Sequence, residues 1–475
     1  MKAFFQTLKN NWILFVPVCV FIIGKILLFQ TYFFWDSIAG LSRPALFLYE
    51  NNFSSFNFPF GTVDDNLLLT SILAVIWKIF GCTLLASHVF SMLVGVAIIY
   101  QLYKLCLFFI PDRKKLPFVY FLVLSDAALV TQSLLLMTDP VMILLAIMSV
   151  NYMLREKRIA FSLSLLGLAL IRARGFDLCI GIGFSYYIFL LQGNQWKRPL
   201  HVLATAIIPF IPSIAAYLGS VVFRSIQYHS FQICRKDPSW ANSLDLVNLK
   251  GFAKNVFSMI RCFADTGRCF LWLTMLLLFI KFKKRIFFEA KSSFLWILFI
   301  GSLLTIIPIT LFVQNTMGMK YFIFEYIMFS LTTGILLFSL LEIRVAKIVA
   351  IMLILGLWTG NLWRYPEKLS VSWDTTLAHI PYYGLRKQML KYIDQNQISY
   401  KEIGSFFPAT AKSSEIELST DDRKFATLDL HKNKYVIYSN IGNMSDELID
   451  TIKSWKMIKE YRQGAVFIQL YKNIE

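Results

Sequence analysis

The sequence predicts a polytopic α-helical membrane protein of about eleven transmembrane helices, with a small soluble α/β domain at its C-terminal end. Of its 475 residues, 57% are hydrophobic and 16% are charged, and the mean hydropathy is +0.58. Soluble proteins contain about 45–50% apolar and about 25% charged residues. Apolar runs long enough to cross the roughly 30 Å hydrocarbon core recur along the chain. After Trp363 the composition changes abruptly to that of a soluble protein.

Charged or turn residues bound each apolar run. The first run follows Lys2 and Lys9 and has no small-residue cleavage site after it, so an uncleaved first span is expected rather than a signal peptide. A further run, 66–80, is short for a span and is predicted to lie in the membrane interface as an amphipathic or re-entrant helix. The predicted spans are 12–31, 85–110, 116–136, 140–154, 159–171, 176–192, 200–223, 268–281, 292–313, 320–341 and 347–363.

Lysine and arginine are distributed unevenly between alternate connections. One set is rich in them, chiefly at 111–115, 155–158 and 281–291. Cytoplasmic loops carry this excess in membrane proteins, so the N-terminus is predicted to be cytoplasmic. The outward-facing segments are then 32–84, 137–139, 172–175, 224–267 and 314–319. Their basic residues, with the long 224–267 connection excluded, are Arg43, Arg172, Arg174 and Lys320.

The chain divides into two predicted domains, a transmembrane domain over 1–363 and an extracytoplasmic α/β domain over 364–475. Because the predicted number of spans is odd, the second domain is expected on the opposite side of the membrane from the N-terminus. In a bacterium this is the periplasmic side. Helices are expected at 383–395 and 445–455, and strands at 434–438 and 465–471. No internal repeat is evident, which weighs against transporters built from duplicated halves.

The formal net charge of +18 does not indicate a nucleic-acid-binding protein, because much of the basic excess lies in short loops between apolar runs. The seven cysteines contain no CxxC pair, although Cys234, Cys262 and Cys269 share one connection and could form a single disulfide. The histidines have no ligand spacing, and nucleotide-binding and zinc-protease motifs are missing from the sequence.

Asp36 follows the first span directly, in the run Phe33-Phe34-Trp35-Asp36-Ser37. Its carboxylate would lie at the outer interface, at the mouth of a cavity, where it could act as a general base. A compatible alternative is that Asp36 caps the helix expected from Ile38 to Tyr49, since aspartate is a preferred N-cap.

Asp139 lies between two spans that almost no loop separates, in Met137-Thr138-Asp139-Pro140. An acid before proline is also a normal helix start. The functional interpretation makes Asp139 a second carboxylate that converges on the same outer cavity as Asp36. Two such carboxylates could orient a hydroxyl nucleophile or hold a divalent cation.

Three basic residues stand out in the outward connections. Arg172 and Arg174 lie in one very short connection, and Lys320 opens the tenth span. The forked guanidinium group of arginine and the ammonium group of lysine are both suited to binding phosphate. The structural alternative is that these long side chains extend toward the lipid headgroups. Asp64 and Asp65 are secondary candidates, for contact with the acceptor. The structural alternative is that they only cap the helix that follows.

Lys25 and Asp126 lie within apolar runs. Ionisable groups inside a membrane suggest function, but either residue could lie near the end of a span. Neither is therefore included in the predicted site.

The order of these motifs resembles the GT-C superfamily of membrane glycosyltransferases, in particular the aminoarabinose-to-lipid A transferases and the protein O-mannosyltransferases. The resemblance covers roughly residues 1–340. It rests on the acid after the first span, an interfacial helix ending in Ile79-Phe80-Gly81, and three later motifs. These are Thr138-Asp139-Pro140, Arg172-Ala173-Arg174-Gly175 and Lys320-Tyr321.

The resemblance implies a sugar donor carried on polyprenyl phosphate and an acceptor that is a lipid, a glycan or a protein. Asp36 would be the base or the acceptor-orienting carboxylate, and Asp139 its partner. Arg172, Arg174, Lys320 and Tyr321 would bind the donor phosphate. The location would be the bacterial inner membrane, and the reaction would be inverting. The acceptor's identity and a metal requirement stay open, because Asp36 lacks the adjacent second acid of the mannosyltransferases.

Two other functions are compatible with the sequence. A transporter or lipid flippase could use the same outer charges as a gate, although transporters place polar sites near the midplane. A non-catalytic assembly factor would work through its C-terminal domain, and its activity would not depend on Asp36 or Asp139.

Overall fold

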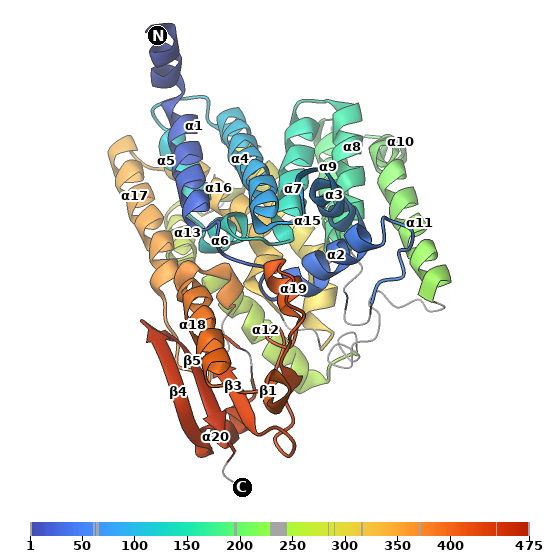
Figure 1. The fold of residues 1–475 in the computed structure, drawn as a ribbon. Helices are drawn as coiled ribbons and strands as arrows, with labels where there is room; N and C mark the ends of the chain where they lie inside the picture. Colours follow the sequence, from blue (N-terminus) through green and yellow to red (C-terminus); the bar gives the residue numbers. More distant parts are fainter. Residues whose placement is uncertain are drawn as a thin grey trace.

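The computed structural model describes residues 2–59, 62, 66–193, 197–228, 245–283, 285–288, 290–314, 317–369, 372–442 and 444–473. Most of the chain forms a helical bundle, and a sheet domain lies at the end of the bundle opposite the N-terminus (Figure 1). The fold class predicted from the sequence is confirmed. Asp64 and Asp65 lie outside the described residues.

Each predicted span falls on a helix or on a pair of helices. Among the described residues, six helices are long and apolar enough to cross a membrane, or eight if each of two bent pairs counts as one span. Asn11–Leu27, Asp139–Leu154 and Arg158–Ile171 are shorter apolar helices. The bundle helices are α1 (Lys2–Leu27), α4 (Leu84–Phe109), α5 (Leu116–Leu124), α6 (Ala127–Leu134), α7 (Asp139–Leu154), α8 (Arg158–Ile171), α9 (Ala173–Gly193), α10 (Pro199–Ile207), η2 (Ile208–Phe210), α11 (Ile211–Tyr228), α13 (Cys269–Phe282), α14 (Arg285–Phe288), α15 (Ala290–Leu311), η3 (Met319–Phe322), α16 (Ile323–Leu340) and α17 (Ile343–Thr359).

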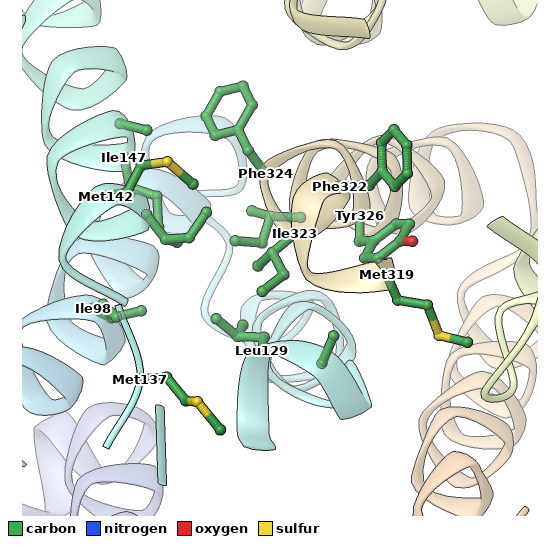
Figure 2. Close-up of a cluster of buried hydrophobic side chains, with 14 of the residues drawn as sticks. Ile98, Leu129, Met137, Met142, Ile147, Met319, Phe322, Ile323, Phe324 and Tyr326 are labelled. Carbon is green, nitrogen blue, oxygen red and sulfur yellow. The ribbon is translucent and has the colours of Figure 1, made fainter. Parts of the chain in front are cut away.

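Helix α16 forms the centre of the bundle, and its side chains are almost all buried. The cluster around it includes Met142, Ile147 and Ile323, which lie where α16 faces α7 (Figure 2). Outer helices instead expose large apolar side chains, such as Leu277 on α13 and Met352 on α17. An apolar exterior of this kind is what a hydrocarbon environment requires.

Small residues line the contact between α9 and α15. A Cβ at Gly181 would lie 2.7 Å from the Cα of Ser302, and one at Gly301 would lie 2.8 Å from Ser185 Oγ. Lipid provides no hydrophobic force between helices, so close backbone approach and dispersion hold such pairs together. The glycines are what allow these two helices to approach so closely.

The predicted span 116–136 falls on two helices, because the chain bends by 66° between α5 and α6. Asp126 N-caps α6, since its Oδ1 accepts hydrogen bonds from the backbone N–H groups of Ala128 and Leu129. At the other end of α6, Lys25 Nζ donates to the carbonyl oxygens of Leu134 and Leu135, at 2.7 and 3.3 Å. The two charges inside the membrane thus hold the ends of a short helix.

Arg268 completes the Asp126 site. Its Nε and Nη2 lie 2.7 and 3.0 Å from the two carboxylate oxygens, and its guanidinium lies 3.6 Å from the centre of the Tyr326 ring. Both charged side chains are 2% exposed. We expect Arg268→Met to lower the free energy of unfolding by about 3 kcal/mol, because it leaves Asp126 buried and unpaired. Thermal denaturation in detergent would measure this.

The matched control is the double variant Asp126→Asn with Arg268→Met, which removes the orphaned charge and should recover most of the stability. If the single and double variants were equally destabilised, the ion pair would not be the cause.

The long connections carry further helices, namely η1 (Ile38–Ser42), α2 (Arg43–Glu50), α3 (Leu67–Phe80) and α12 (Leu249–Ala264). Helix α3 falls on the predicted interfacial segment 66–80. Helix α12 lies within the connection 224–267, for which no helix was predicted. Cys262 and Cys269 are free thiols, and Cys234 lies outside the described residues.

The C-terminal part contains a five-stranded sheet in the order β2-β1-β3-β5-β4. Strand β1 pairs in parallel with β2 and β3, and β5 is antiparallel to β3 and β4. The two predicted helices and two predicted strands are found, whereas β1, β2 and β4 were not predicted. The elements are η4 (Gly360–Leu362), η5 (Trp373–Thr375), η6 (Leu377–His379), α18 (Pro381–Gln395), η7 (Tyr400–Glu402), β1 (Ile403–Ser405), α19 (Ser413–Glu417), β2 (Ala426–Thr427), β3 (Tyr435–Ser439), α20 (Asp446–Ser454), β4 (Lys456–Gln463) and β5 (Val466–Lys472).

The sheet domain is joined firmly to the segment that follows α1, which the sequence predicts to be the first outer loop. Arg43 forms a two-pronged ion pair with Glu415, and Ser42 Oγ donates to the Glu415 carbonyl oxygen at 2.6 Å. The Phe33 N–H donates to the Ile416 carbonyl oxygen. One continuous apolar core runs from the bundle into this domain. The first outer loop is therefore held between the bundle and the sheet.

Candidate active site

Asp36 lies in the helical turn that directly precedes η1. The preceding side chains Phe33 and Phe34 are buried, and Ser37 Oγ bonds to both the N–H and the carbonyl oxygen of Phe34. Ser37, not Asp36, occupies the N-cap position of η1. The alternative that Asp36 caps the following helix is therefore wrong. Its carboxylate accepts a hydrogen bond from Lys320 instead.

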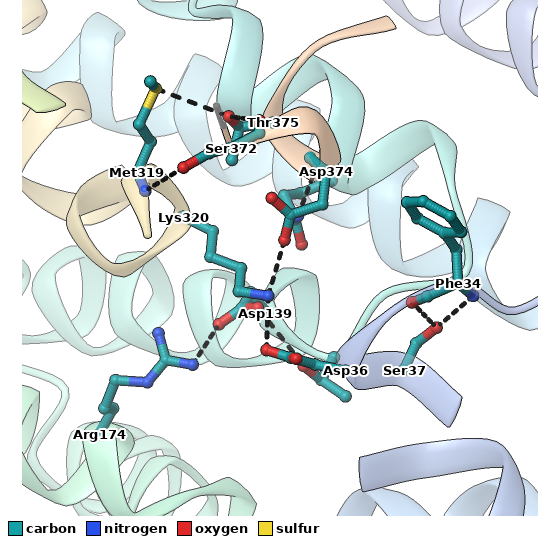
Figure 3. A network of polar contacts seen from close by, with 12 residues as sticks. Phe34, Asp36, Ser37, Asp139, Arg174, Met319, Lys320, Ser372, Asp374 and Thr375 are labelled. Carbon is teal, nitrogen blue, oxygen red and sulfur yellow. Dashed lines mark hydrogen bonds and ion pairs between the residues drawn. The ribbon is translucent and has the colours of Figure 1, made fainter. Parts of the chain in front are cut away.

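Lys320 lies on η3, just before the buried helix α16. Its Nζ is 2.7 Å from Asp36 Oδ2 and 2.7 Å from Asp374 Oδ2, so that one ammonium group lies between two carboxylates (Figure 3). The Lys320 side chain is 7% exposed. The Lys320 ammonium group has three N–H donors. Two can serve Asp36 and Asp374, and one is left for a further acceptor.

Asp374 belongs to η5, in the segment that leads from the bundle to the sheet domain. Gln132 of α6 donates to its backbone oxygen at 2.8 Å, and the Met319 N–H donates to the Ser372 hydroxyl at 3.4 Å. The capped helix α6 thus supports Asp374, and η5 is tied to η3. Asp374 is not among the site residues that the sequence predicts. The only available signal was the Trp373-Asp374 pair, which repeats Trp35-Asp36.

Asp139 begins α7 and is fully buried. Arg172 Nη1 and Arg174 Nη2 lie 3.2 and 3.4 Å from its Oδ1, and Arg172 also donates to Thr138 Oγ1 at 3.1 Å. The Arg174 guanidinium lies 3.7 Å from the centre of the Tyr321 ring, next to Lys320. The short connection between α8 and α9 therefore directs both arginines at one carboxylate.

The structure thus brings together Asp36, Asp139, Arg172, Arg174, Lys320 and Tyr321 from four separate stretches of chain. It adds Asp374, so that three cations face three carboxylates. The role of Asp64 and Asp65 stays a prediction, because residues 63–65 lie outside the described part.

The pKa of Asp36 is lowered to about 2. Burial alone would raise this pKa, but Lys320 and then Arg172 stabilise the charged form and outweigh that effect. Asp36 is consequently an ionised carboxylate throughout the ordinary pH range. While Lys320 holds it, it is also a weak proton acceptor.

The observed partners of Asp36 and Asp139 are side-chain cations. In the described ranges, no three His, Cys, Asp or Glu side chains are placed to hold one metal ion. A divalent cation between these two carboxylates stays a prediction.

An apolar crevice adjoins the site between α3, α4 and α7, with about 320 Å³ of empty space that is partly open to solvent. Met137 and Pro140, which flank Asp139 in the sequence, form part of its wall. Hydrocarbon could enter here while a polar head reached the charged cluster. The other lining residues include Leu69, Leu73, Phe90 and Val94.

No protein-family model and no curated protein matches the sequence. Among solved structures, the chain is similar to ArnT from Cupriavidus metallidurans bound to undecaprenyl phosphate, with a TM-score of 0.50 and 12% sequence identity. The match covers 71% of this chain and 61% of ArnT, so the chain spans about three fifths of the length of that protein. This membrane protein therefore has the fold of ArnT.

Proposed function

We propose that the protein transfers a sugar from a polyprenyl-phosphate carrier to a hydroxyl group on a lipid, glycan or protein. The observation that carries this proposal is the cluster of Lys320, Arg172 and Arg174 with Asp36, beside an apolar crevice. The ArnT structure with the same fold holds undecaprenyl phosphate, which supports a ligand of this class. A lipid phosphate needs cations for its head and an apolar surface for its tail.

In this proposal the cations act on the leaving group. The bond between the anomeric carbon and the phosphate oxygen breaks, and its electron pair stays on the phosphate. Lys320, Arg172 and Arg174 would stabilise that charge. The acceptor oxygen forms the new bond to the anomeric carbon as its proton passes to the Asp36 carboxylate. Direct displacement of this kind inverts the anomeric centre.

Asp36 is better placed than Asp139 to take the proton. The Asp36 side chain is 25% exposed, whereas that of Asp139 is 0% exposed and contacts two arginines. A base must reach the proton that it removes. Asp139 would then be a positioning residue that orients Arg172 and Arg174.

Donor binding would also activate Asp36. Lys320 is shared between Asp36 and Asp374, so an arriving phosphate competes with both carboxylates for one ammonium group. When Lys320 turns to the phosphate, Asp36 loses its largest stabilising charge and its pKa rises. The carboxylate thus becomes a stronger base only when a donor is present.

The proposed location is the bacterial inner membrane, with the N-terminus in the cytoplasm and the sheet domain on the outer side. The N-terminal end of α1 and the sheet domain lie at opposite ends of the bundle (Figure 1). The basic connections identified in the sequence would then be cytoplasmic, as the positive-inside rule expects. The site would face the membrane surface where a lipid-linked donor can meet acceptors.

We expect the purified protein in lipid nanodiscs to bind undecaprenyl phosphate, as detected by native mass spectrometry. Undecaprenol, which has the same tail without the phosphate, should bind at least about tenfold more weakly if the cations contribute about 1.4 kcal/mol. Equal binding of both lipids would contradict a phosphate site.

Mass spectrometry of envelope glycans with and without the protein would then identify the transferred sugar. A flippase would change the sidedness of a lipid without a new glycosidic bond, which this comparison distinguishes.

A further inference from the structure

A second pocket lies between the sheet domain and the first outer loop. It contains about 400 Å³ of empty space, part of which is open to solvent. The carboxyl ends of the parallel strands β1 and β3, at Ser405 and Ser439, form one side. Trp35 and the first turns of α18 form the other. In open α/β sheets, ligands bind in the crevice outside the carboxyl ends of parallel strands, where connections leave in opposite directions. Here β1 lies between β2 and β3, so this end of the sheet is such a point.

Aromatic rings make up much of the pocket wall. They come from the first outer loop, from α18, from β3 and from the connections around β1 and β2. Rings of this kind present flat faces with partial negative charge, which attract the weakly positive C–H groups of a non-aromatic ring. The rings belong to Trp35, Tyr382, Phe406, Phe425 and Tyr438.

The pocket offers no uncompensated charge. Arg386 is the one charged side chain among the described residues that line it, and Arg386 forms an ion pair with Glu417 and lies over the Tyr32 ring. The Ser405 and Ser439 hydroxyls donate to the carbonyl oxygens of Ile437 and Phe467, and Ser439 Oγ also accepts from the Ile441 N–H. Each hydroxyl oxygen keeps capacity to accept from a ligand hydroxyl. These features favour a neutral ligand that carries several hydroxyl groups.

Trp35 connects this pocket to the charged site. It lines the pocket and precedes Asp36, so the two Cα atoms are about 3.8 Å apart. Its φ of 50° lies in the left-handed region, which a bulky side chain rarely adopts. Strained backbone of this kind persists where the surroundings impose it, often at ligand sites. A group bound against Trp35 would contact the residue that directly precedes Asp36.

We infer that this pocket binds a neutral sugar ring of the acceptor and presents one of its hydroxyl groups to Asp36. The inference rests on the proposed function and narrows it, since it makes the acceptor a glycan or a glycolipid. The sheet domain then recognises the acceptor, while the bundle holds the donor.

The test measures sugar binding without any donor. The protein in lipid nanodiscs, free of glycoside detergents, is titrated with methyl glucopyranoside and with methyl N-acetylglucosaminide, and saturation-transfer NMR detects binding. Ala409→Phe places a ring in the pocket from a half-buried position of its wall. Thr420→Phe adds the same ring at an exposed site of the same domain that does not line the pocket. Gly442→Ala is a second pocket variant, because its Cβ would meet the Phe406 ring at 2.1 Å and displace it.

We expect saturable binding of at least one glycoside, weakened at least tenfold by Ala409→Phe and reduced by Gly442→Ala, with Thr420→Phe unchanged. No binding of either glycoside, or equal binding in all variants, would overturn the inference. Preferential binding of N-acetyltyrosinamide would overturn it in favour of a peptide. Undecaprenyl phosphate binding, measured in parallel, should be the same in every variant. If the wild type did not bind undecaprenyl phosphate, that result would count against the proposed function. The sugar titration would still test the pocket by itself.

Discussion

Replacing Lys320 with methionine should reduce sugar transfer by about 10³-fold and weaken undecaprenyl phosphate binding at least tenfold. The ammonium group is the point where Asp36 and Asp374 meet, and in the proposed mechanism it stabilises the charge that develops on the departing phosphate. Native mass spectrometry measures the binding. Single-turnover transfer of the sugar found in the envelope comparison measures the rate.

Loss of Lys320 also leaves two carboxylates without their cation, which could destabilise the fold. The double variant Lys320→Met with Asp374→Asn removes one of these charges, so it should recover thermal stability but not transfer. Asp374→Asn alone should bind undecaprenyl phosphate more tightly, because a competitor for Lys320 is gone. If Lys320→Met bound and transferred like the wild type, the phosphate assignment would be wrong.

Much of the charged site was predictable because its residues lie at the outer ends of apolar runs. Asp36, Asp139 and Lys320 each lie where a span begins or ends on the same predicted side. Alternating topology alone places such residues at one end of a bundle. The two closely spaced arginines, Arg172 and Arg174, stood out because outward connections were otherwise poor in basic residues. That rarity is a signal which a single sequence can carry.

Asp374 was not predictable in the same way. It lies beyond the last span, in a polar segment where aspartate is common, and its partner Lys320 is 54 residues away. Only the packing of η5 against α6 brings the two together. Secondary structure missed in the sheet domain, such as β1 and β2, consists of strands of three and two residues that carry no periodicity.

The bend at Asp126 shows why hydropathy mistakes a broken helix for a continuous span. Residues 116–136 are apolar enough for one span, but Asp126 bonds to the backbone of the next turn and to Arg268. Because Asp126 is buried, its charge needs a cation as a partner. That partner is Arg268, which is 142 residues away along the sequence. Lys25 and Asp126, two ionisable residues within apolar runs, therefore have a structural role in holding α6. Through Gln132, α6 in turn supports Asp374.

Asp36→Asn should reduce sugar transfer by about 10³-fold, within the range for a lost acid–base group. Donor binding should not fall, because an amide releases Lys320 from one of its two charged partners. Asp139→Asn is the matched comparison. It loosens Arg172 and Arg174 and should weaken undecaprenyl phosphate binding as well as transfer. Equal loss of donor binding in both variants would contradict separate roles for the two carboxylates.

The pH dependence of transfer provides the sharper test of Asp36 as the base. In the free protein its pKa is about 2, so kcat/KM should show no acid limb from this group at or above pH 4. In the donor complex Lys320 turns to the phosphate and the pKa of Asp36 rises, so more of the carboxylate is protonated at a given acid pH. The value of kcat should therefore decline on the acid side at a higher pH than kcat/KM does. In Asp36→Asn the residual kcat should lose this limb. Identical acid limbs in kcat and kcat/KM would mean that donor binding does not free the carboxylate, and the coupling between phosphate capture and base strength would have to be abandoned.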